Sequence, residues 1–289
     1  MIPEKLDTSK IRKLLFLGPR GSYSDFAKNK FIDAFDLNCV STNLKSISGI
    51  IKALKDENNE DMAAVIPIEN SIEGIVRETL DNLSSLKKEG FKIIAETTLN
   101  VEHALIGFCD KKSEIKVVRS HPQALAQCKR YLQANFADSL IEEATLSTSA
   151  AIRSLSKEEP SIAAIGSVEC ARMYDIPVVE EKINDEENNQ TRFIFLGKFL
   201  APQTCNDKTS ITFSTENKAG ALSKILTILE ENNINMSYID SRPSKKELGE
   251  YVFYIDFEGH INDEKVQKAF DKIKPLVKMF YVIGSYHTV

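Results

Sequence analysis

The order of apolar and polar positions divides the first 200 residues into alternating strands and helices. Short apolar runs are typical of buried strands, and the stretches between them repeat apolar residues at helical spacing. A long extended stretch, residues 91–108, separates two such series, and the chain returns to the first series near residue 189. We therefore expect an α/β fold whose two parallel-sheet lobes flank a cleft. The clearest strand-like runs are 14–17, 62–68, 115–118 and 162–166.

The last 80 residues follow a different order. Residues 201–207 have the composition of a linker, and the segments beyond them alternate as strand, helix, two strands, helix and strand. This βαββαβ order predicts a ferredoxin-like unit. The expected parts are a leader (1–12), lobe one (13–100 and 189–200), lobe two (101–188), the linker, and a C-terminal unit (208–289).

Composition narrows the class of protein. The chain has 289 residues and a net charge of −5, so no basic surface favours nucleic acid or anionic lipid. No apolar run is long enough to cross a bilayer, and the N-terminus lacks the apolar core of an export signal. Five scattered cysteines indicate reduced thiols, and neither Cys nor His shows metal-ligand spacing. We expect a cytoplasmic protein without metal or nucleotide cofactor.

Polar residues follow three of the predicted strands, where ligands bind in open α/β sheets. The first strand leads into a Gly- and Pro-rich turn whose Ser22 or Ser24 can cap a helix, and such a helix start suits an anion. The second ends in Glu69-Asn70-Ser71, where Asn70 or Ser71 either caps the next helix, from about residue 73 to 86, or faces a ligand. The third delivers Ser120 and His121, and His121 is either a structural cap or a catalyst.

A hydroxyl and a guanidinium, Thr191 and Arg192, stand side by side at the start of a late apolar strand. The guanidinium of Arg is suited to carboxylates, and a strand can aim the stiff Thr hydroxyl accurately. On a long helix predicted over residues 123–132, Gln123 and Gln127 share a face with Ser120, which suggests a ligand surface. For an isolated Thr-Arg pair the simpler interpretation is an edge-strand Thr beside a solvated Arg.

Five stretches together resemble the signatures of the prephenate dehydratases, in the same order along the chain. They are GPRGSYS (18–24), IPIENS (66–71), SHPQALAQC (120–128), AAIG (163–166) and NQTRF (189–193). The tail is similar to an ACT regulatory domain, through its Gly-Ala-Leu (220–222) and Asp-Ser-Arg-Pro (240–243) segments. The resemblance covers about residues 13–287. ACT domains of this kind often carry Glu where this chain has Asp240.

The resemblance implies decarboxylating dehydration of prephenate to phenylpyruvate, in phenylalanine biosynthesis, with no cofactor. It makes Thr191 the catalytic threonine, acting as a donor toward the departing ring hydroxyl. The general acid stays open between Glu69 and His121. The expected catalytic residues are Thr191, Asn70, Ser120 and Gln127, and the expected substrate-binding residues are Arg192, Phe193, Ser22, Ser71, His121 and Thr148.

The tail implies feedback inhibition by L-phenylalanine and assembly into a homodimer or homotetramer. The expected phenylalanine-binding residues are Asn217, Gly220, Ala221, Leu222, Asp240, Ser241, Arg242 and Pro243. Three alternatives remain: a non-catalytic two-lobe binding protein, since the lobes also resemble periplasmic-binding-protein-like folds; an amino-acid-sensing regulator; and an enzyme that acts on arogenate.

Overall fold

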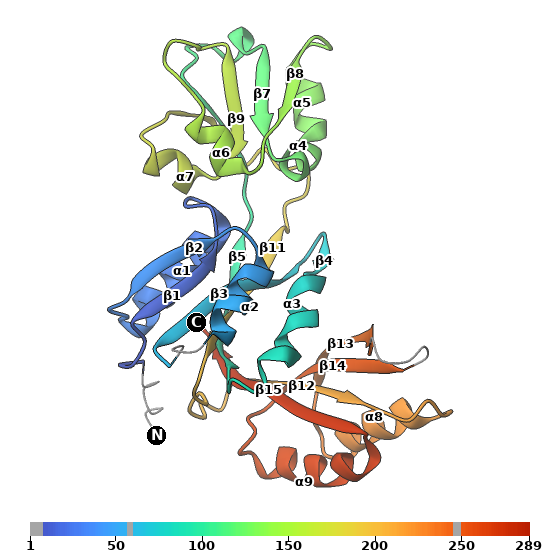
Figure 1. Cartoon of the computed structure of the whole chain (residues 1–289). Coiled ribbons are helices and arrows are strands. Elements are labelled where there is room, and N and C mark those ends of the chain that lie inside the picture. Colours follow the sequence, from blue (N-terminus) through green and yellow to red (C-terminus); the bar gives the residue numbers. More distant parts are fainter. Residues whose placement is uncertain (1–7, 57–59, 245–249) are drawn as a thin grey trace.

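The computed structural model describes residues 8–56, 60–244 and 250–289. Its strands form a ten-stranded and a five-stranded sheet. Figure 1 shows an upper lobe joined by two chain segments to a larger lower part, in which the N-terminal lobe and the C-terminal unit lie together. Most of the leader (residues 1–12) lies outside the described residues.

Lobe one is a mixed sheet covered on both faces. The first strand, β1, runs parallel to its neighbours β2 and β3, whereas β11 runs antiparallel to both β3 and β5, between which it lies. The strands are β1 (Lys13–Leu17), β2 (Val40–Leu44), β3 (Met62–Asn70), β4 (Gly74–Ile75), β5 (Lys92–Asn100) and β11 (Gln190–Gly197), and the helices are α1 (Tyr23–Phe35), α2 (Ile47–Lys55), α3 (Arg77–Leu83) and the 3-10 turn η1 (Ser84–Leu86).

Apolar side chains that alternate between the two faces of the sheet form two hydrophobic cores in lobe one. On one face, Leu14 and Phe16 of β1 pack with Ala27 and Phe31 of α1. On the other face, Leu15 packs with α2 and α3. Successive strand residues point to opposite faces, so a single strand supplies both cores.

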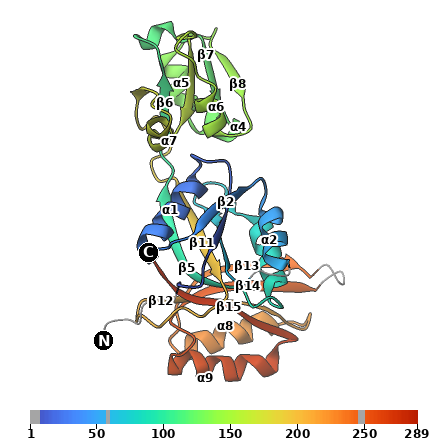
Figure 2. The same cartoon turned by 60° about the vertical axis from the view of Figure 1, so that its left-hand side comes forward.

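Lobe two is a smaller mixed sheet in the order β10-β6-β9-β7-β8. The chain enters it after β5 and leaves it before β11, and Figure 2 shows these two crossing segments side by side. Its strands are β6 (Ala104–Gly107), β7 (Val117–Ser120), β8 (Ile141–Ala144), β9 (Ile162–Gly166) and β10 (Val178–Glu180), and its helices are η2 (Lys112–Glu114), α4 (Pro122–Gln127), α5 (Lys129–Asn135), α6 (Thr148–Arg153) and α7 (Val168–Met173).

The C-terminal unit has the predicted βαββαβ order, which confirms the ferredoxin-like prediction. Both of its helices pack on one face of its four strands, as Figure 2 shows below the sheet. Its elements are β12 (Asp207–Ser214), α8 (Ala221–Glu231), β13 (Met236–Pro243), β14 (Tyr251–Glu258), α9 (Glu264–Ile273), η3 (Lys274–Leu276) and β15 (Met279–Thr288).

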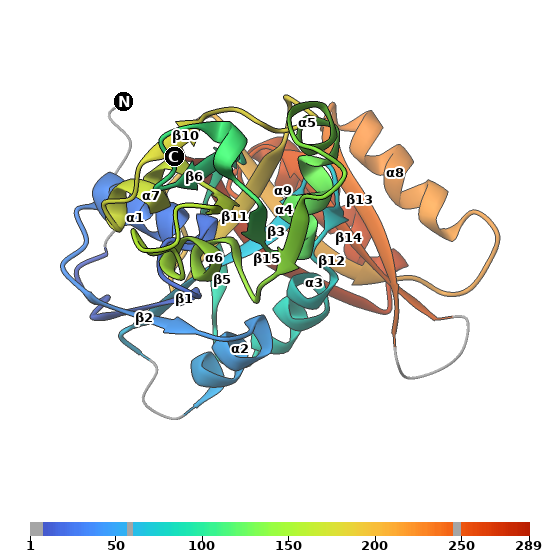
Figure 3. The same cartoon turned by 90° about the horizontal axis from the view of Figure 1, so that it is seen from above.

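The C-terminal unit continues the sheet of lobe one. Strand β15 pairs in parallel with β5, so the order runs β13-β14-β12-β15-β5-β11-β3-β1-β2. Gly284 of β15 makes this approach possible, because a Cβ there would lie 2.2 Å from the carbonyl oxygen of Ile93. In Figure 3, viewed from above, the red and orange strands extend the sheet of lobe one in this way.

The two-lobed α/β architecture is confirmed, but the sheets are mixed rather than parallel. The chain enters lobe two after β5 and returns to lobe one through β11. Strand β11 therefore runs antiparallel to β5. In lobe two, β6 likewise runs antiparallel to β9.

Three local predictions are wrong. The helix expected at residues 73–86 begins only at Arg77, because β4 first pairs back on β3, and neither Asn70 nor Ser71 caps it. The helix expected at 123–132 is interrupted at Cys128, which has φ −119° and ψ 17°. The third prediction, which follows from the residue type of Asn217, is that this side chain caps the first helix of the C-terminal unit, but the N-cap of α8 is Gly220.

No helix among the described residues has both the length and the apolar composition needed to cross a membrane. None of the five cysteines forms a disulfide.

Candidate active site

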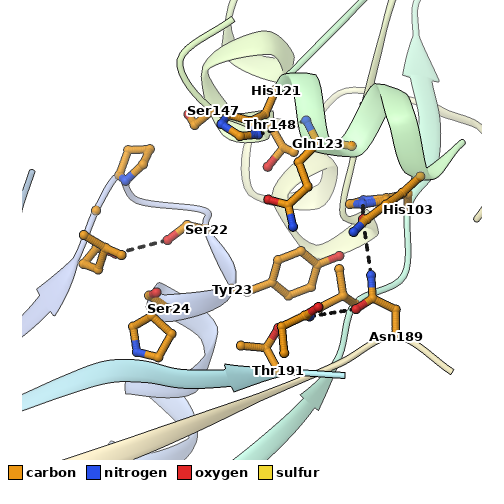
Figure 4. Close-up of a pocket in the computed structure, with 18 of the residues that line it drawn as sticks. Ser22, Tyr23, Ser24, His103, His121, Gln123, Ser147, Thr148, Asn189 and Thr191 are labelled. Atoms are coloured by element: carbon orange, nitrogen blue, oxygen red, sulfur yellow. Dashed lines mark hydrogen bonds between the residues drawn. The ribbon is translucent and has the colours of Figure 1, made fainter. Parts of the chain in front are cut away.

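A cavity of about 310 Å³ opens between the two lobes. Lobe one contributes the turn after β1, the start of α1, and residues of β3 and β11; lobe two contributes the starts of α4 and α6 (Figure 4). The segments that join the lobes supply Val101, His103 and Asn189. The cavity thus lies where relative movement of the lobes would open or close it.

Thr191 lies on the cavity wall, and Asn70 determines which way its hydroxyl can donate. The Asn70 side-chain oxygen accepts from the backbone N–H groups of Ile72 (3.0 Å) and Glu73 (2.9 Å), which fixes the orientation of the amide. Its Nδ2 group therefore faces Thr191 and donates to the hydroxyl oxygen at 2.9 Å. The hydroxyl proton of Thr191 is left to donate elsewhere.

A chain of amides continues from this pair into lobe two. Asn70 Nδ2 also donates to Asn189 Oδ1 (2.8 Å), and Asn189 Nδ2 donates to Gln127 Oε1 (3.2 Å). That oxygen lies 3.0 Å from His103 Nε2, so the imidazole carries its proton on Nε2. Among the described residues, neither the buried Gln127 Nε2 nor His103 Nδ1 has a hydrogen-bond partner. Gln127 and His103 therefore keep an unused donor group and an unused acceptor beside the cavity.

Burial disfavours the charged forms of His103 and Tyr23, two titratable groups at the cavity. It lowers the pKa of His103, and the hydrogen bond to Gln127 only partly opposes this. Burial also raises the pKa of Tyr23, whose hydroxyl donates to the carbonyl oxygen of Glu102 at 2.6 Å. Tyr23 thereby ties the start of α1 to the segment joining the lobes.

Helix starts supply the positive potential of the cavity. Ser22 caps α1 by accepting from the N–H of Asp25, and Ser147 caps α6 by accepting from the N–H of Ala150. His121 caps α4 through Nδ1. The first N–H groups of a helix lack intrahelical acceptors, so these ends favour anions. No Lys, Arg, Asp or Glu is among the described residues that line the cavity.

Seven of the ten predicted site residues lie together on the cavity wall, as Figure 4 shows for Ser22, His121, Thr148 and Thr191. The full set is Thr191, Asn70, Gln127, Phe193, Ser22, His121 and Thr148.

Three predicted site residues do not line the cavity. Ser120 is fully buried and donates to the carbonyl oxygen of Ile165 (2.7 Å). Ser71 donates to the carbonyl oxygen of Asn188 (2.8 Å), so it holds the returning chain against β3. The assignment of Arg192 to the substrate is wrong in this structure, because its side chain points to the other face of the sheet from Thr191.

Arg192 instead pairs with three carboxylates, one of which belongs to Glu69 (3.3 Å). Glu69 lies outside the cavity, so of the two candidate general acids only His121 borders it.

Tyr23, His103 and Asn189 line the cavity but were not predicted as site residues. Asn189 could have been found, since residues at i and i+2 of a strand share a face and Thr191 and Phe193 were already chosen. His103 is a single histidine before an apolar strand, and nothing local distinguishes it from a core residue.

The predicted regulatory residues lie in two places on the C-terminal unit. Asn217, Ala221 and Leu222 border a hollow of about 120 Å³ with Tyr251 and Phe253. Residues 240–243 belong to β13, and Arg242 Nε there donates to Asp81 of α3 at 2.9 Å. A single chain therefore does not gather all eight residues around one hollow.

The described residues contain no group of three or more His, Cys, Asp or Glu side chains that could hold a metal ion.

Comparison with known proteins identifies the family. The family model described as prephenate dehydratase matches residues 14–199, and the ACT domain model matches residues 209–275. A prephenate dehydratase of Methanocaldococcus jannaschii is 40% identical, with 95% of this chain and 98% of that protein covered. A bifunctional chorismate mutase/prephenate dehydratase of Pseudomonas aeruginosa is 34% identical, over 95% of this chain and 73% of that protein.

A solved structure of similar fold is the prephenate dehydratase of Arthrobacter aurescens in complex with L-Phe. It has a TM-score of 0.81 and 28% sequence identity, and covers 95% of this chain and 89% of that one. With both family models and a close full-length relative in agreement, the chain belongs to the prephenate dehydratase family and carries a C-terminal ACT domain.

Proposed function

We propose that this protein converts prephenate to phenylpyruvate, carbon dioxide and water in the cavity between the lobes. The observation that carries the proposal is the Asn70–Thr191 pair, which leaves one hydroxyl proton free on the cavity wall. In the reaction the bond to the ring carboxylate breaks, and its electrons complete the aromatic ring. The ring hydroxyl leaves from the opposite carbon and takes up a proton to form water.

Thr191 acts as the donor to the departing hydroxyl. A neutral hydroxyl is a weak acid, but a positioned donor in a site shielded from water stabilises developing charge well. Gln127 supplies a second donor from lobe two, so closure of the lobes would bring both donors onto the substrate. The network needs no reorganisation, because Asn70 and Asn189 already hold it.

The cavity suits a dianion. Helix starts and neutral donors replace water around the two carboxylates. Arogenate would instead bring an ammonium group, for which the lining residues offer no carboxylate. This favours prephenate over arogenate.

L-Phenylalanine is the proposed inhibitor, bound by the ACT domain. The relative from Arthrobacter aurescens is in complex with L-Phe. Gly220 supports the assignment, because a Cβ placed on it would meet no atom within 4 Å, so space for a ligand adjoins the start of α8. Since residues 240–243 lie apart from that space in one chain, a second copy would complete the pocket, as in the proposed homodimer or dimer of dimers.

The experiment compares three variants of the full-length protein in phenylpyruvate formation. Thr191→Val should lower kcat by about two orders of magnitude, the scale of a lost positioned donor, and Thr191→Ser should retain much of it. Thr98→Ala is the matched control, since Thr98 is an exposed threonine opposite Arg192 on β5. Wild-type turnover by Thr191→Val would refute the role of Thr191. Incubation with arogenate, read by phenylalanine formation, tests the substrate assignment separately.

A further inference from the structure

The side chain of Arg192 joins the ACT domain to the strand that carries Thr191. The side chain is 13% exposed, and its guanidinium lies 2.6 Å from Asp256 Oδ2 of β14. Its other contacts are Glu96 Oε2 of β5 and Glu69 Oε2 of β3, each at 3.3 Å. One buried cation is thus held by carboxylates from both the catalytic domain and the ACT domain.

The ACT domain fixes both buried carboxylates from its own side. Asp256 Oδ1 accepts from the hydroxyl of Ser210 on β12 at 2.6 Å, and that hydroxyl lies 2.7 Å from the hydroxyl of the fully buried Tyr286. Glu96 Oε1 pairs with Lys208 of β12 at 2.5 Å. A shift of β12 or β14 would therefore move the carboxylates that hold Arg192.

The backbone carries such a shift directly to the cavity. Thr191 and Phe193 flank Arg192 on β11, and both line the cavity on the other face of the sheet. A hydroxyl displaced by about 1 Å loses much of its catalytic effect. The arrangement is also incompletely satisfied, because Arg192 Nε and Glu96 Oε2 are buried and, among the described residues, neither makes a hydrogen bond. A second arrangement of the same charges is therefore within reach.

We propose that Arg192 and Asp256 are positioning residues: their ion pair aligns Thr191 on β11, and through it the state of the ACT domain reaches the reaction. The regulatory half of this proposal rests on the proposed phenylalanine inhibition; the positioning half does not. A second ion pair between the domains, Arg242–Asp81, serves as the control, because it contacts α3 and not β11, the strand that carries Thr191.

The first experiment measures kcat and KM of Asp256→Asn and Asp81→Asn in the full-length protein. Asp256→Asn keeps the shape of the side chain and should lower kcat about tenfold with KM changed less than about twofold, because alignment of a transition-state donor is lost while binding is kept. Asp81→Asn should leave kcat within about twofold. Ser210→Ala leaves the charge of Asp256 in place but removes the hydrogen bond that holds its carboxylate. It should therefore also lower kcat, by a smaller factor than Asp256→Asn.

Thermal unfolding separates loss of alignment from loss of fold. If Asp256→Asn unfolds at the assay temperature, Ser210→Ala decides the question. Wild-type kcat in every folded variant of Asp256 and Ser210, or an equal loss in Asp81→Asn, overturns the positioning role.

The second experiment tests the regulatory half by the factor by which saturating phenylalanine changes kcat/KM. In Asp256→Asn this factor should shrink at least about fivefold, while calorimetry still detects phenylalanine binding. An unchanged factor overturns this half. If the wild type binds no phenylalanine, the proposed regulation itself fails, and the kcat comparison still tests the positioning role.

Discussion

Asn70 turns a common hydroxyl into a directed donor. Its amide is held by two backbone N–H groups at one end and by Thr191 and Asn189 at the other, so Thr191 can only accept from it. A Thr hydroxyl without such a partner would rotate among several acceptors. The free proton of Thr191 therefore depends on a neighbouring strand, and not on Thr191 alone.

Asn70→Ala should reproduce most of the defect of Thr191→Val. We expect kcat to fall by about one to two orders of magnitude, because the Thr191 hydroxyl loses its fixed orientation. The double variant Asn70→Ala/Thr191→Val should be little worse than Thr191→Val, and steady-state kinetics on all three measures this. Multiplicative losses in the double variant would mean that Asn70 acts independently of Thr191.

His103 should make the folded protein sensitive to acid. Its pKa is lowered in the folded state, so below the unfolded value of about 6.5 the unfolded chain binds a proton that the folded chain does not. The free energy of unfolding should therefore fall as pH drops below about 6.5, until the lower folded pKa is reached. Urea unfolding of wild type and His103→Gln at pH 8 and pH 5.5 tests this: the loss on acidification should be smaller in the variant. Equal losses would exclude His103 as the source.

The residue types at the site were predictable from the sequence, but the directions in which their side chains point were less so. The stretch around Thr191 was expected to face the ligand, and Thr191 does lie on the cavity wall, yet two adjacent strand residues cannot both face one cavity. Arg192 was assigned by the affinity of guanidinium for carboxylates, and it does bind carboxylates, but those of Glu96 and Asp256. The partners come from strands distant in sequence, so no local pattern could show them.

Among the elements, α8 has an unusual start. Its N-cap is Gly220, with φ +78°, and no side chain caps the helix. This left-handed conformation costs residues other than Gly about 1–2 kcal/mol, except Asn and Asp, which tolerate it better. Conformation and open space at Gly220 are thus two separate reasons for glycine, and substitutions can separate them.

Gly220→Asn and Gly220→Val should differ in stability but agree in regulation. Asn should keep the melting temperature close to that of the wild type, whereas Val should lower it through backbone strain. Both place a side chain in the open space and should weaken phenylalanine binding and inhibition. Thermal unfolding, calorimetry and rate curves against phenylalanine measure the three quantities. Normal inhibition of Gly220→Asn would show that the ligand does not use this space.

Element boundaries were predictable wherever one local signal dominated. Strand β9 begins and ends where the apolar pattern places it. The prediction failed at β4, where residues 74–75 pair with β3 before the helix can begin. It also failed at Cys128, where an apolar stripe continues across a break in the helix. In both places a tertiary contact or a local backbone angle overrides the periodicity.

At the scale of the whole molecule, the catalytic lobe and the ACT domain share a sheet and a core. Tyr254, Ile283 and Tyr286 of the ACT domain pack in the same cluster as Leu15 and Leu80 of lobe one. The sequence predicted the two units and the linker but could not show this junction. Strands β15 and β5 lie some 190 residues apart, and each has the local pattern of an ordinary strand. A composition-based linker therefore does not imply independent domains.

A fragment ending at Leu200 should accordingly be less stable than the full chain and should self-associate. Without the ACT domain, the edge of β5 would be uncovered, the core of lobe one would lose Tyr254, Ile283 and Tyr286 among others, and Glu96 would lack Lys208. Bare strand edges pair with other chains. Thermal unfolding should show a lower Tm, and light scattering should show mass that rises with concentration. As a control, a separate polypeptide of residues 201–289 should restore a single low-mass species and raise the Tm, because it can supply β15 to the edge of β5. A monomeric fragment with the Tm of the full chain would show that lobe one is complete without the ACT domain, and that the shared sheet contributes little to its stability.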